Sequence, residues 1–305
     1  MKVAAIDIGT NSVLLLIAET SPNGGLLPLV ERATITRLGE GVDRTRALAP
    51  PAISRTLDCL SDYAKDLARH APERLSIVGT SAMRDASGGP ELADRAEELL
   101  GVRPLVISGQ REAELTFRGT LSGLGLEGPV AVFDVGGGST EIVVGTASDG
   151  NIASATSLDI GSVRLFERHV KSDPPSPSEL DAVRTAVDRV LFAEPTIPGA
   201  ATLVGVAGTV TTLAAIASAI DPYDASRIHG ARLALETIRA LAERLARLSL
   251  ADRKKLPGLD PRRADVIVAG SLLVERFVTW SRKPEIVVSN RGVRWGLAEE
   301  LASLT

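Results

Sequence analysis

The chain has 305 residues, which is enough for two domains, each with its own core. Its 44% apolar and 24% charged residues are typical of a soluble globular protein, and a net charge of −4 argues against general attraction to nucleic acid. The single cysteine, Cys59, excludes an internal disulfide framework and is compatible with the reducing cytoplasm, where we expect the protein to reside.

No segment predicts a membrane span or a cleavable signal. Asp7 interrupts the first apolar run, and the uncharged stretch from Thr196 to Ile220 is broken by Pro198, glycines and hydroxyl side chains. This second stretch instead predicts a buried strand followed by a buried helix.

The first part of the chain predicts an α/β domain that opens with a β-hairpin. A turn cluster from Pro22 to Gly25 separates the hairpin from the next strand. In chain order, the expected elements are strands at 3–8, 13–18 and 26–38, a helix at about 53–69, a strand at 74–78, a helix at about 90–100 and a strand at 104–107.

The turn of this hairpin carries the first candidate ligand residues. Glycine has no Cβ, so the backbone there can approach a ligand closely, and the N–H groups of such a turn suit a phosphate. The candidates are Asp7, Gly9, Thr10, Asn11 and Ser12.

Three further candidates follow strand ends, where open α/β sheets place ligands. Arg84 is a candidate phosphate clamp, although its position suits a surface arginine equally well. Glu112 and Glu114 open a helix after Ser108, where the helix dipole favours carboxylates. One of them could instead act as a general base on water, and only one, because residues two apart face different ways.

A central stretch from Val130 to Val144 repeats the N-terminal layout of apolar run, Asp-x-Gly-x-x-Ser and second apolar run. Its loop predicts amide donors for phosphate at Gly136, Gly137, Gly138 and Ser139. Asp134 suits Mg²⁺, which prefers oxygen ligands together with phosphate. A glycine-rich hairpin without a ligand is the alternative. The two copies indicate an internal duplication with two phosphate loops facing each other across a cleft.

The remainder of the chain predicts a second α/β domain. Leu203 to Thr209 forms a third strand-to-glycine turn, which adds Gly208 to the candidate phosphate ligands and leads into a buried helix. The other expected elements are a strand at 152–158, a turn at 159–162 opening a helix, a surface linker at 174–177, helices at 179–191, about 234–248 and about 261–280, a strand at 285–289 and a closing helix.

These motifs resemble known families. The loops at 7–12 and 134–141, with the turn at 205–209, resemble the actin, sugar kinase and Hsp70 superfamily. Within it, Thr80–Ala86, Ser108–Ala113, Asp134–Glu141 and Gly161–Arg164 resemble the exopolyphosphatase/guanosine pentaphosphate phosphohydrolase (Ppx/GppA) family, in its short form.

The resemblance implies two actin-like (ribonuclease H-like) domains with the active site in the cleft between them. Domain I would span 1–117, completed by a closing helix at 291–305, and domain II would span 118–290. The implied reaction is Mg²⁺-dependent release of terminal phosphate from inorganic polyphosphate or from a phosphorylated guanosine nucleotide, pppGpp. The short form is usually associated with polyphosphate.

The resemblance also implies roles for single residues. Glu112 would activate water, and Arg84 would bind the phosphate being removed. Asp134 and Glu141 would hold the metal or its waters. Amides of 136–139 would bind phosphate, and Asp7 and Asn11 would complete the opposite wall.

Two residues depart from the family pattern, and several alternatives stay open. Arg111 replaces an acidic residue common before the matching glutamate, and Asn290 stands where an aspartate is frequent. An ATP-dependent kinase or a non-enzymatic sensor of the same superfamily are rival functions, and the oligomeric state, a homodimer included, is left open. A long polyphosphate tail would need basic partners, for which the candidates are Arg37, Arg44 and Arg46.

Overall fold

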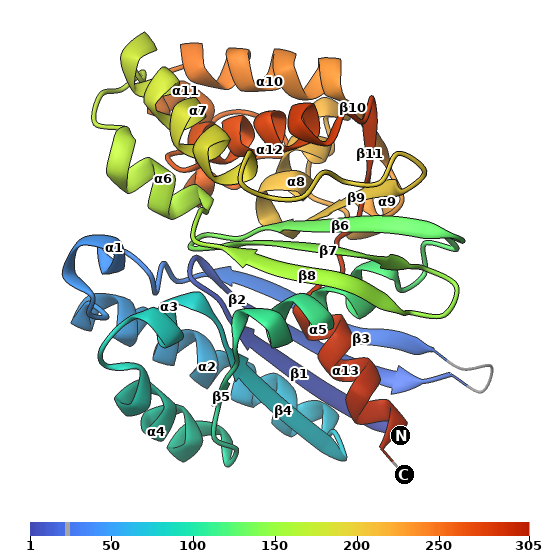
Figure 1. The fold of residues 1–305 in the computed structure, drawn as a ribbon. Coiled ribbons are helices and arrows are strands. Elements are labelled where there is room, and N and C mark those ends of the chain that lie inside the picture. The colour runs from blue at the N-terminus through green and yellow to red at the C-terminus, as the bar shows by residue number, and fades with distance from the viewer. Residues whose placement is uncertain (22–24, 305) are drawn as a thin grey trace. The chain divides into compact units, whose positions relative to one another are not determined.

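The computed structural model describes residues 1–21 and 25–304, which form a mixed α/β structure with two β-sheets (Figure 1). The predicted α/β class is confirmed. The chain divides into two compact units, Met1–Gly119 together with the C-terminal segment from Gly292, and Thr120–Arg291. These bounds differ by one or two residues from the domain bounds predicted from the sequence. The predicted turn at 22–25 lies, apart from Gly25, outside the described residues.

The first unit is built on a five-stranded sheet of order β3-β2-β1-β4-β5. The first three strands are antiparallel neighbours, whereas β4 and β5 run parallel to β1. The strands are β1 (Lys2–Ile8), β2 (Ser12–Thr20), β3 (Leu26–Ile35), β4 (Arg74–Gly79) and β5 (Leu105–Val106). The helices are α1 (Val42–Thr45), α2 (Pro50–His70), α3 (Ser81–Asp85), α4 (Gly89–Leu100), α5 (Gly109–Leu121) and α13 (Val293–Ser303).

The alternation of side chains along β1 determines which face its last polar residue occupies. Ala4, Ile6 and Ile8 pack in the core that contains α2 and α4. Val3 and Ala5 pack on the other face, in a cluster that includes residues of α5 and α13. Asp7 continues the series of Val3 and Ala5, so its side chain belongs to the face covered by α5 and α13.

The second unit contains a six-stranded sheet of order β10-β11-β9-β6-β7-β8. The strands are β6 (Pro129–Val135), β7 (Thr140–Thr146), β8 (Ile152–Leu158), β9 (Thr202–Val206), β10 (Arg232–Ala234) and β11 (Glu285–Val288). Read from β8, the order β8-β7-β6-β9-β11 has the same strand directions as β3-β2-β1-β4-β5. The shared topology supports the predicted internal duplication.

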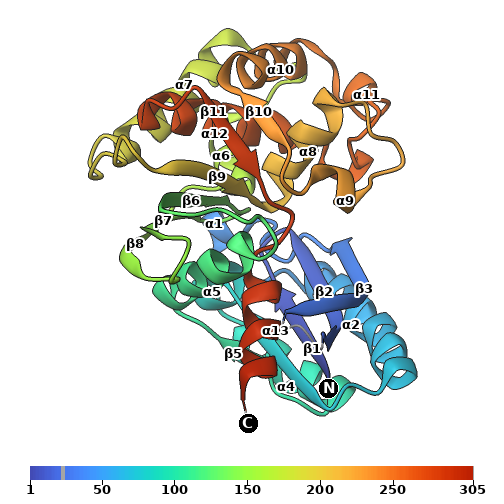
Figure 2. The same cartoon turned by 90° about the vertical axis from the view of Figure 1, so that its right-hand side faces the viewer.

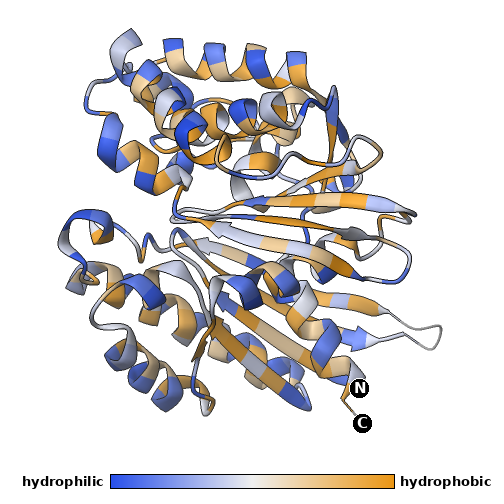
Figure 3. Cartoon of the chain, viewed as in Figure 1, coloured by the Kyte–Doolittle hydropathy of each residue, from blue (hydrophilic) through white to orange (hydrophobic). Residues whose placement is uncertain are grey.

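Helices cover one face of this second sheet, as Figure 2 shows for α7, α8, α10 and α12. Phe133 of β6 stacks on Phe277 of α12 with ring centroids 4.3 Å apart, within a core that β6 and β9 share with these helices. Apolar residues follow the strands and the inner sides of the helices (Figure 3). The helices are α6 (Ser162–His169), α7 (Pro177–Leu191), α8 (Ala207–Ala217), α9 (Ala225–Ile228), α10 (Leu235–Arg247), α11 (Leu250–Arg253) and α12 (Ile267–Ser281).

The predicted start of one helix was wrong. The helix expected from about 261 begins at Ile267, and Pro261–Arg263 forms a 3-10 turn instead. Side-chain carboxylates compete with the helix here, because Asp260 accepts from the backbone N–H of Arg262 and Asp265 from that of Val266, both at 2.9 Å.

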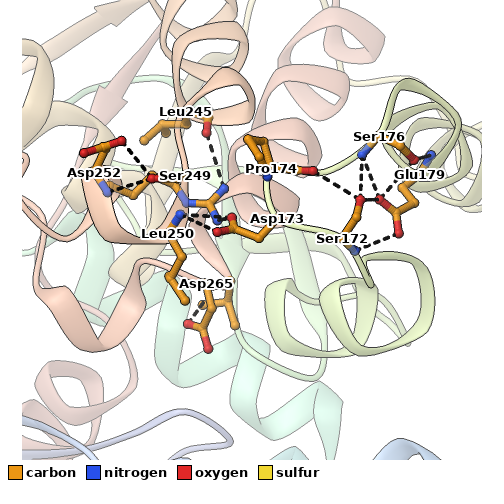
Figure 4. Close-up of polar contacts among 12 residues, drawn as sticks. Ser172, Asp173, Pro174, Ser176, Glu179, Leu245, Ser249, Leu250, Asp252 and Asp265 are labelled. Atoms are coloured by element: carbon orange, nitrogen blue, oxygen red, sulfur yellow. Dashed lines mark hydrogen bonds and ion pairs between the residues drawn. The ribbon is translucent and has the colours of Figure 1, made fainter.

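The predicted linker at 174–177 is held by polar contacts on both sides (Figure 4). Asp173 accepts from the backbone N–H of Leu250 at the start of α11 (2.8 Å) and from the Arg253 guanidinium (2.7 Å). Ser176 and Glu179 form a capping box that opens α7. Hydrogen bonds, first from the Ser172 hydroxyl and then from backbone N–H groups, lower the pKa of Glu179 to about 2. Within the described part of the chain, no helix has both the length and the apolar character that crossing a membrane requires.

Candidate active site

The glycine loop of the second unit connects β6 to β7. The N–H of Gly136 donates to the carbonyl of Ser139 at 3.1 Å, which closes a tight turn. A β-carbon at Gly136 would lie 3.0 Å from that carbonyl oxygen, so the turn favours a glycine. The sequence prediction of a tight glycine turn between two strands therefore holds, and its phosphate-binding role stays a prediction.

The two carboxylates predicted to hold a metal are direct neighbours in this hairpin. Asp134 of β6 pairs with Glu141 of β7 in the antiparallel register, so the two side chains lie on the same face of the sheet. Asp134 alternates with the core residues Phe133 and Val135, so this face is the one opposite the helical core. Glu141 is 1% exposed, and its Oε1 accepts from the hydroxyl of Ser157 at 2.7 Å.

This pair of residues fits a magnesium ion. Like charges directly opposite each other in a sheet are destabilising, and a divalent cation would offset that repulsion. Across residues 1–21 and 25–304, no cluster of three or more His, Cys, Asp or Glu side chains suited to a metal occurs. Mg²⁺ typically binds through one or two carboxylates plus waters and substrate phosphates, so two carboxylates suffice.

The first unit repeats the glycine turn at Gly9. Its N–H donates to the carbonyl of Ser12 at 3.0 Å, and a β-carbon at Gly9 would lie 2.9 Å from that oxygen. The turns at Gly9 and Gly136, 127 positions apart in the sequence, are therefore closed by equivalent hydrogen bonds. In the first of these turns, Thr10 and Asn11 lie between Gly9 and Ser12 and are buried.

Asn11 carries the clearest sign of a ligand in this turn. Its side-chain Nδ2 is buried and has no hydrogen-bond partner among the described residues. A buried donor without a partner is costly, which is expected where a ligand completes the hydrogen bond. This feature supports Asn11 as a ligand-binding residue.

Arg84 and Glu112, the two predicted catalytic residues, contact each other within the first unit. Arg84 lies in the last turn of α3, and its Nη1 donates to Glu112 Oε2 and to the carbonyl of Ile107, both at 3.0 Å. Glu112, in the first turn of α5, is 8% exposed. Burial raises the pKa of Glu112, and the hydrogen bond and charge of Arg84 oppose that rise. A buried carboxylate with a raised pKa is a typical general base.

The structure distinguishes Glu112 from its neighbour Glu114. Glu114 accepts from Arg111 at 3.3 Å, and Arg111 also pairs with Glu300 of α13. Arg111, which departs from the family pattern, thus belongs to an ion-pair group that holds α13 against α5. Its guanidinium pairs with these two carboxylates, whereas that of Arg84 pairs with Glu112.

An arginine side chain lies against the third glycine turn, and the role of Gly208 as a phosphate ligand stays a prediction. The guanidinium of Arg263 lies against Gly208, where a β-carbon would be 2.1 Å from Nη1. Burial lowers the pKa of Arg263, and the charge of Asp260 opposes this. The sequence did not single out Arg263, which lies in the 3-10 turn before α12.

Asn290 and three arginines are the other residues that the sequence singled out. Asn290, between β11 and α13, has its Oδ1 buried without a hydrogen-bond partner among the described residues. Arg44 and Arg46 are exposed in and after α1, and Arg37 is half-buried after β3. Gly161 and the first residues of α6, 162–164, contact the glycine loop between β6 and β7. This stretch belongs to the motifs that resemble the family, but the sequence assigned it no role.

Comparisons with known proteins agree with this arrangement. The Ppx/GppA phosphatase family model matches residues 16–303. The chain is 41% identical over 317 aligned positions to Exopolyphosphatase 2 of Mycobacterium tuberculosis, covering 99% of this chain and 98% of that protein. It is 30% identical to the guanosine-5'-triphosphate,3'-diphosphate pyrophosphatase of Vibrio atlanticus, covering 98% of this chain and 59% of the relative.

A solved structure shows the same fold. The crystal structure of the Aquifex aeolicus Ppx/GppA family member matches with a TM-score of 0.83 and 33% identity, over 99% of this chain and 97% of that one. The two units are therefore the two domains of an actin-like fold, as the loops at 7–12 and 134–141 predicted. With these sequence and structural matches, the chain belongs to the Ppx/GppA phosphatase family.

Proposed function

We propose that this protein is an exopolyphosphatase-type phosphohydrolase, which releases the terminal phosphate of inorganic polyphosphate by attack of water. The observation that carries the proposal is the contact between Arg84 and the buried Glu112 in the first unit. It brings together a base and a cation, the two groups that transfer of a phosphoryl group to water requires.

In the proposed reaction, a water oxygen attacks the terminal phosphorus while the bridging P–O bond breaks. The shortened polyphosphate leaves with the electron pair of that bond, and the proton of the water passes to Glu112. The raised pKa of Glu112 makes it a stronger base than an exposed glutamate. Arg84 would stabilise the charge on the phosphate oxygens, to which a planar guanidinium can donate two hydrogen bonds.

The two glycine turns would bind the phosphate chain through backbone N–H groups. Asp134 and Glu141 would hold Mg²⁺, which when bound neutralises charge on the phosphate oxygens. Asn11 would donate from its buried Nδ2. The same proposal includes Asp7 and Gly208 as ligand residues. It also includes the cytoplasm as the compartment and a homodimer as the assembly.

Hydrolysis of pppGpp is the second candidate function, because it breaks the same kind of phosphoanhydride bond. It is supported by the similarity to the Vibrio atlanticus pyrophosphatase, which extends over 98% of this chain. The similarity to Exopolyphosphatase 2 is higher and covers 98% of that relative, so we favour polyphosphate.

An ATP-dependent kinase would need room for adenosine beside Gly205 to Thr209. The Arg263 guanidinium lies directly against Gly208, which disfavours a nucleoside at that position.

The proposal is tested with the purified full chain, Mg²⁺ and a panel of polyphosphate, pppGpp and ATP, without any hydroxyl acceptor. Release of inorganic phosphate from polyphosphate at a higher kcat/KM than from pppGpp is expected. Faster release from pppGpp would favour the second function. Phosphate transfer only after an acceptor is added would indicate a kinase, and binding without turnover would indicate a sensor.

A further inference from the structure

The start of α6 binds the glycine loop between β6 and β7 through hydrogen bonds to the carbonyl oxygens of the loop. Three successive carbonyl oxygens of the loop accept hydrogen bonds from this one segment. The bonds run from Ser162 N–H to Gly136 (3.0 Å), from the N–H groups of Val163 and Arg164 to Gly137 (2.9 and 3.1 Å), and from Arg164 Nε–H to Gly138 (2.8 Å).

Peptide geometry turns this observation into a statement about the opposite side of the loop. A trans peptide unit is planar, and its C=O and the following N–H point in opposite directions. Because the carbonyls of Gly136, Gly137 and Gly138 point to α6, the N–H groups of Gly137, Gly138 and Ser139 point away from it. The loop thus presents donors on one side and keeps its carbonyl oxygens, which repel anions, on the other.

The first unit achieves the same orientation with a different sequence. The N–H of Gly39 donates to the carbonyl of Thr10 at 2.8 Å, and those of Thr36 and Arg37 donate to Asn11 at 3.1 and 3.0 Å. In both units the holding segment follows the third strand of the sheet. Both contacts need a glycine, since a β-carbon at Gly39 would lie 2.2 Å from a Thr10 methyl and one at Gly161 would lie 2.4 Å from the Gly137 oxygen.

Only in the second unit does the loop carbonyl bond to a charged side chain, among the contacts described for the two loops. Arg164 is 8% exposed, and arginine is rarely buried unless its donors are used. A charged donor on the Gly138 carbonyl also polarises the peptide unit it belongs to, which strengthens the Ser139 N–H as a donor.

We propose that Arg164 is a positioning residue that directs the amide donors of the loop Gly136–Ser139 toward the substrate phosphate. The role rests on the proposed function. Arg164 acts through the backbone of the loop and does not contact the phosphate itself. Gly161 serves the same end by letting α6 approach the loop.

The test compares Arg164→Met, Arg164→Lys and Arg168→Met in the full chain with Mg²⁺. Methionine removes the donor to Gly138 at similar side-chain length, and lysine restores one donor. Arg168 lies one turn later on α6 and is exposed, so Arg168→Met is the matched control. We measure kcat and KM for tripolyphosphate, the thermal unfolding midpoint, and the amide shifts of ¹⁵N-glycine-labelled protein on titration with inorganic phosphate.

Arg164→Met should raise KM roughly 10- to 100-fold, the scale expected if the loop amides that it positions lose one hydrogen bond to the charged phosphate. The phosphate-induced shifts of the Gly137 and Gly138 amides should be lost, while Arg168→Met behaves as the wild type and Arg164→Lys recovers part of the effect. A folded Arg164→Met protein with wild-type KM and wild-type glycine shifts would overturn the proposal.

Two further outcomes are separable. If Arg164→Met does not fold, the test rests on Arg164→Lys and on Gly161→Ala, which displaces the same loop. The proposal is supported if Arg164→Lys has the KM and glycine shifts of Arg168→Met while Gly161→Ala has a raised KM. A wild-type KM in Gly161→Ala as well would overturn the proposal. If the wild type releases no phosphate but its glycine shifts depend on Arg164, the proposed function fails and the positioning role stands.

Discussion

Replacing Arg84 by methionine is expected to move the acid limb of the pH–rate profile to higher pH. Burial raises the pKa of Glu112, and the hydrogen bond and charge of Arg84 counteract part of that rise. Methionine keeps much of the side-chain length but removes both. The pKa of Glu112 therefore rises further, and because a general base must be unprotonated to act, activity begins to fall at a higher pH.

The size of the shift follows from the contact that is lost. A hydrogen bond to a charged group contributes about 1.5–3 kcal/mol, and one pKa unit corresponds to about 1.4 kcal/mol. The side chains of Arg84 and Glu112 are 25% and 10% exposed, so solvent screens their interaction only in part. A displacement of about 1–2 pH units is expected.

The measurement is kcat/KM for phosphate release from tripolyphosphate between pH 5 and 9 at saturating Mg²⁺. Arg111→Met is the matched control, since Arg111 precedes Glu112 but pairs with Glu114 and Glu300. The absolute rate of Arg84→Met should also fall, because Arg84 is a proposed phosphate ligand. An acid limb that stays in place, moves to lower pH, or moves equally in Arg111→Met would refute the reasoning.

Three other perturbations test separate parts of the molecule. Asp134→Asn should raise the Mg²⁺ midpoint of activity by at least about tenfold, whereas Asp85→Asn should not; an unaltered midpoint in folded Asp134→Asn would exclude the metal role. Glu179→Gln should lower the unfolding temperature at neutral pH. Because the folded pKa of Glu179 is depressed to about 2, its contribution is complete above the ordinary 4.5 and is lost as pH falls through 2, so wild type and variant should converge there; a constant difference would contradict this. Added salt should reduce activity on long polyphosphate more steeply than on tripolyphosphate, since exposed charges are screened beyond about 8 Å, and equal sensitivity would remove a tail-binding role for Arg37, Arg44 and Arg46.

Local backbone requirements were the features most readily predicted from the sequence. A turn closed from Gly9 N–H to the Ser12 carbonyl, or from Gly136 to Ser139, requires a glycine and is flanked by two strands. Both requirements are visible as Asp-x-Gly-x-x-Ser between apolar runs, so the loops and their repetition could be recognised without a structure.

Features that depend on distant partners could not be predicted. The residues alone left Glu112 and Glu114 open, and only the family resemblance favoured Glu112. The contact of Glu112 with Arg84, 28 residues earlier in the chain, is visible only in the structure. The role of Arg164 depends on a carbonyl 26 residues away. The predicted start of α12 was wrong for a local reason, because the carboxylates of Asp260 and Asp265 accept hydrogen bonds from nearby backbone N–H groups that compete with the helix. For Glu112 and Arg164, the residues themselves could be identified in the sequence but their distant partners could not.

The loss of turnover in Glu112→Gln tests the central claim most directly. Phosphate release from polyphosphate should fall by roughly 10²- to 10⁴-fold, the usual contribution of a general base, while Glu114→Gln stays near the wild type. Near-normal kcat in Glu112→Gln, with loss in Glu114→Gln, would show that the wrong carboxylate has been assigned as the base.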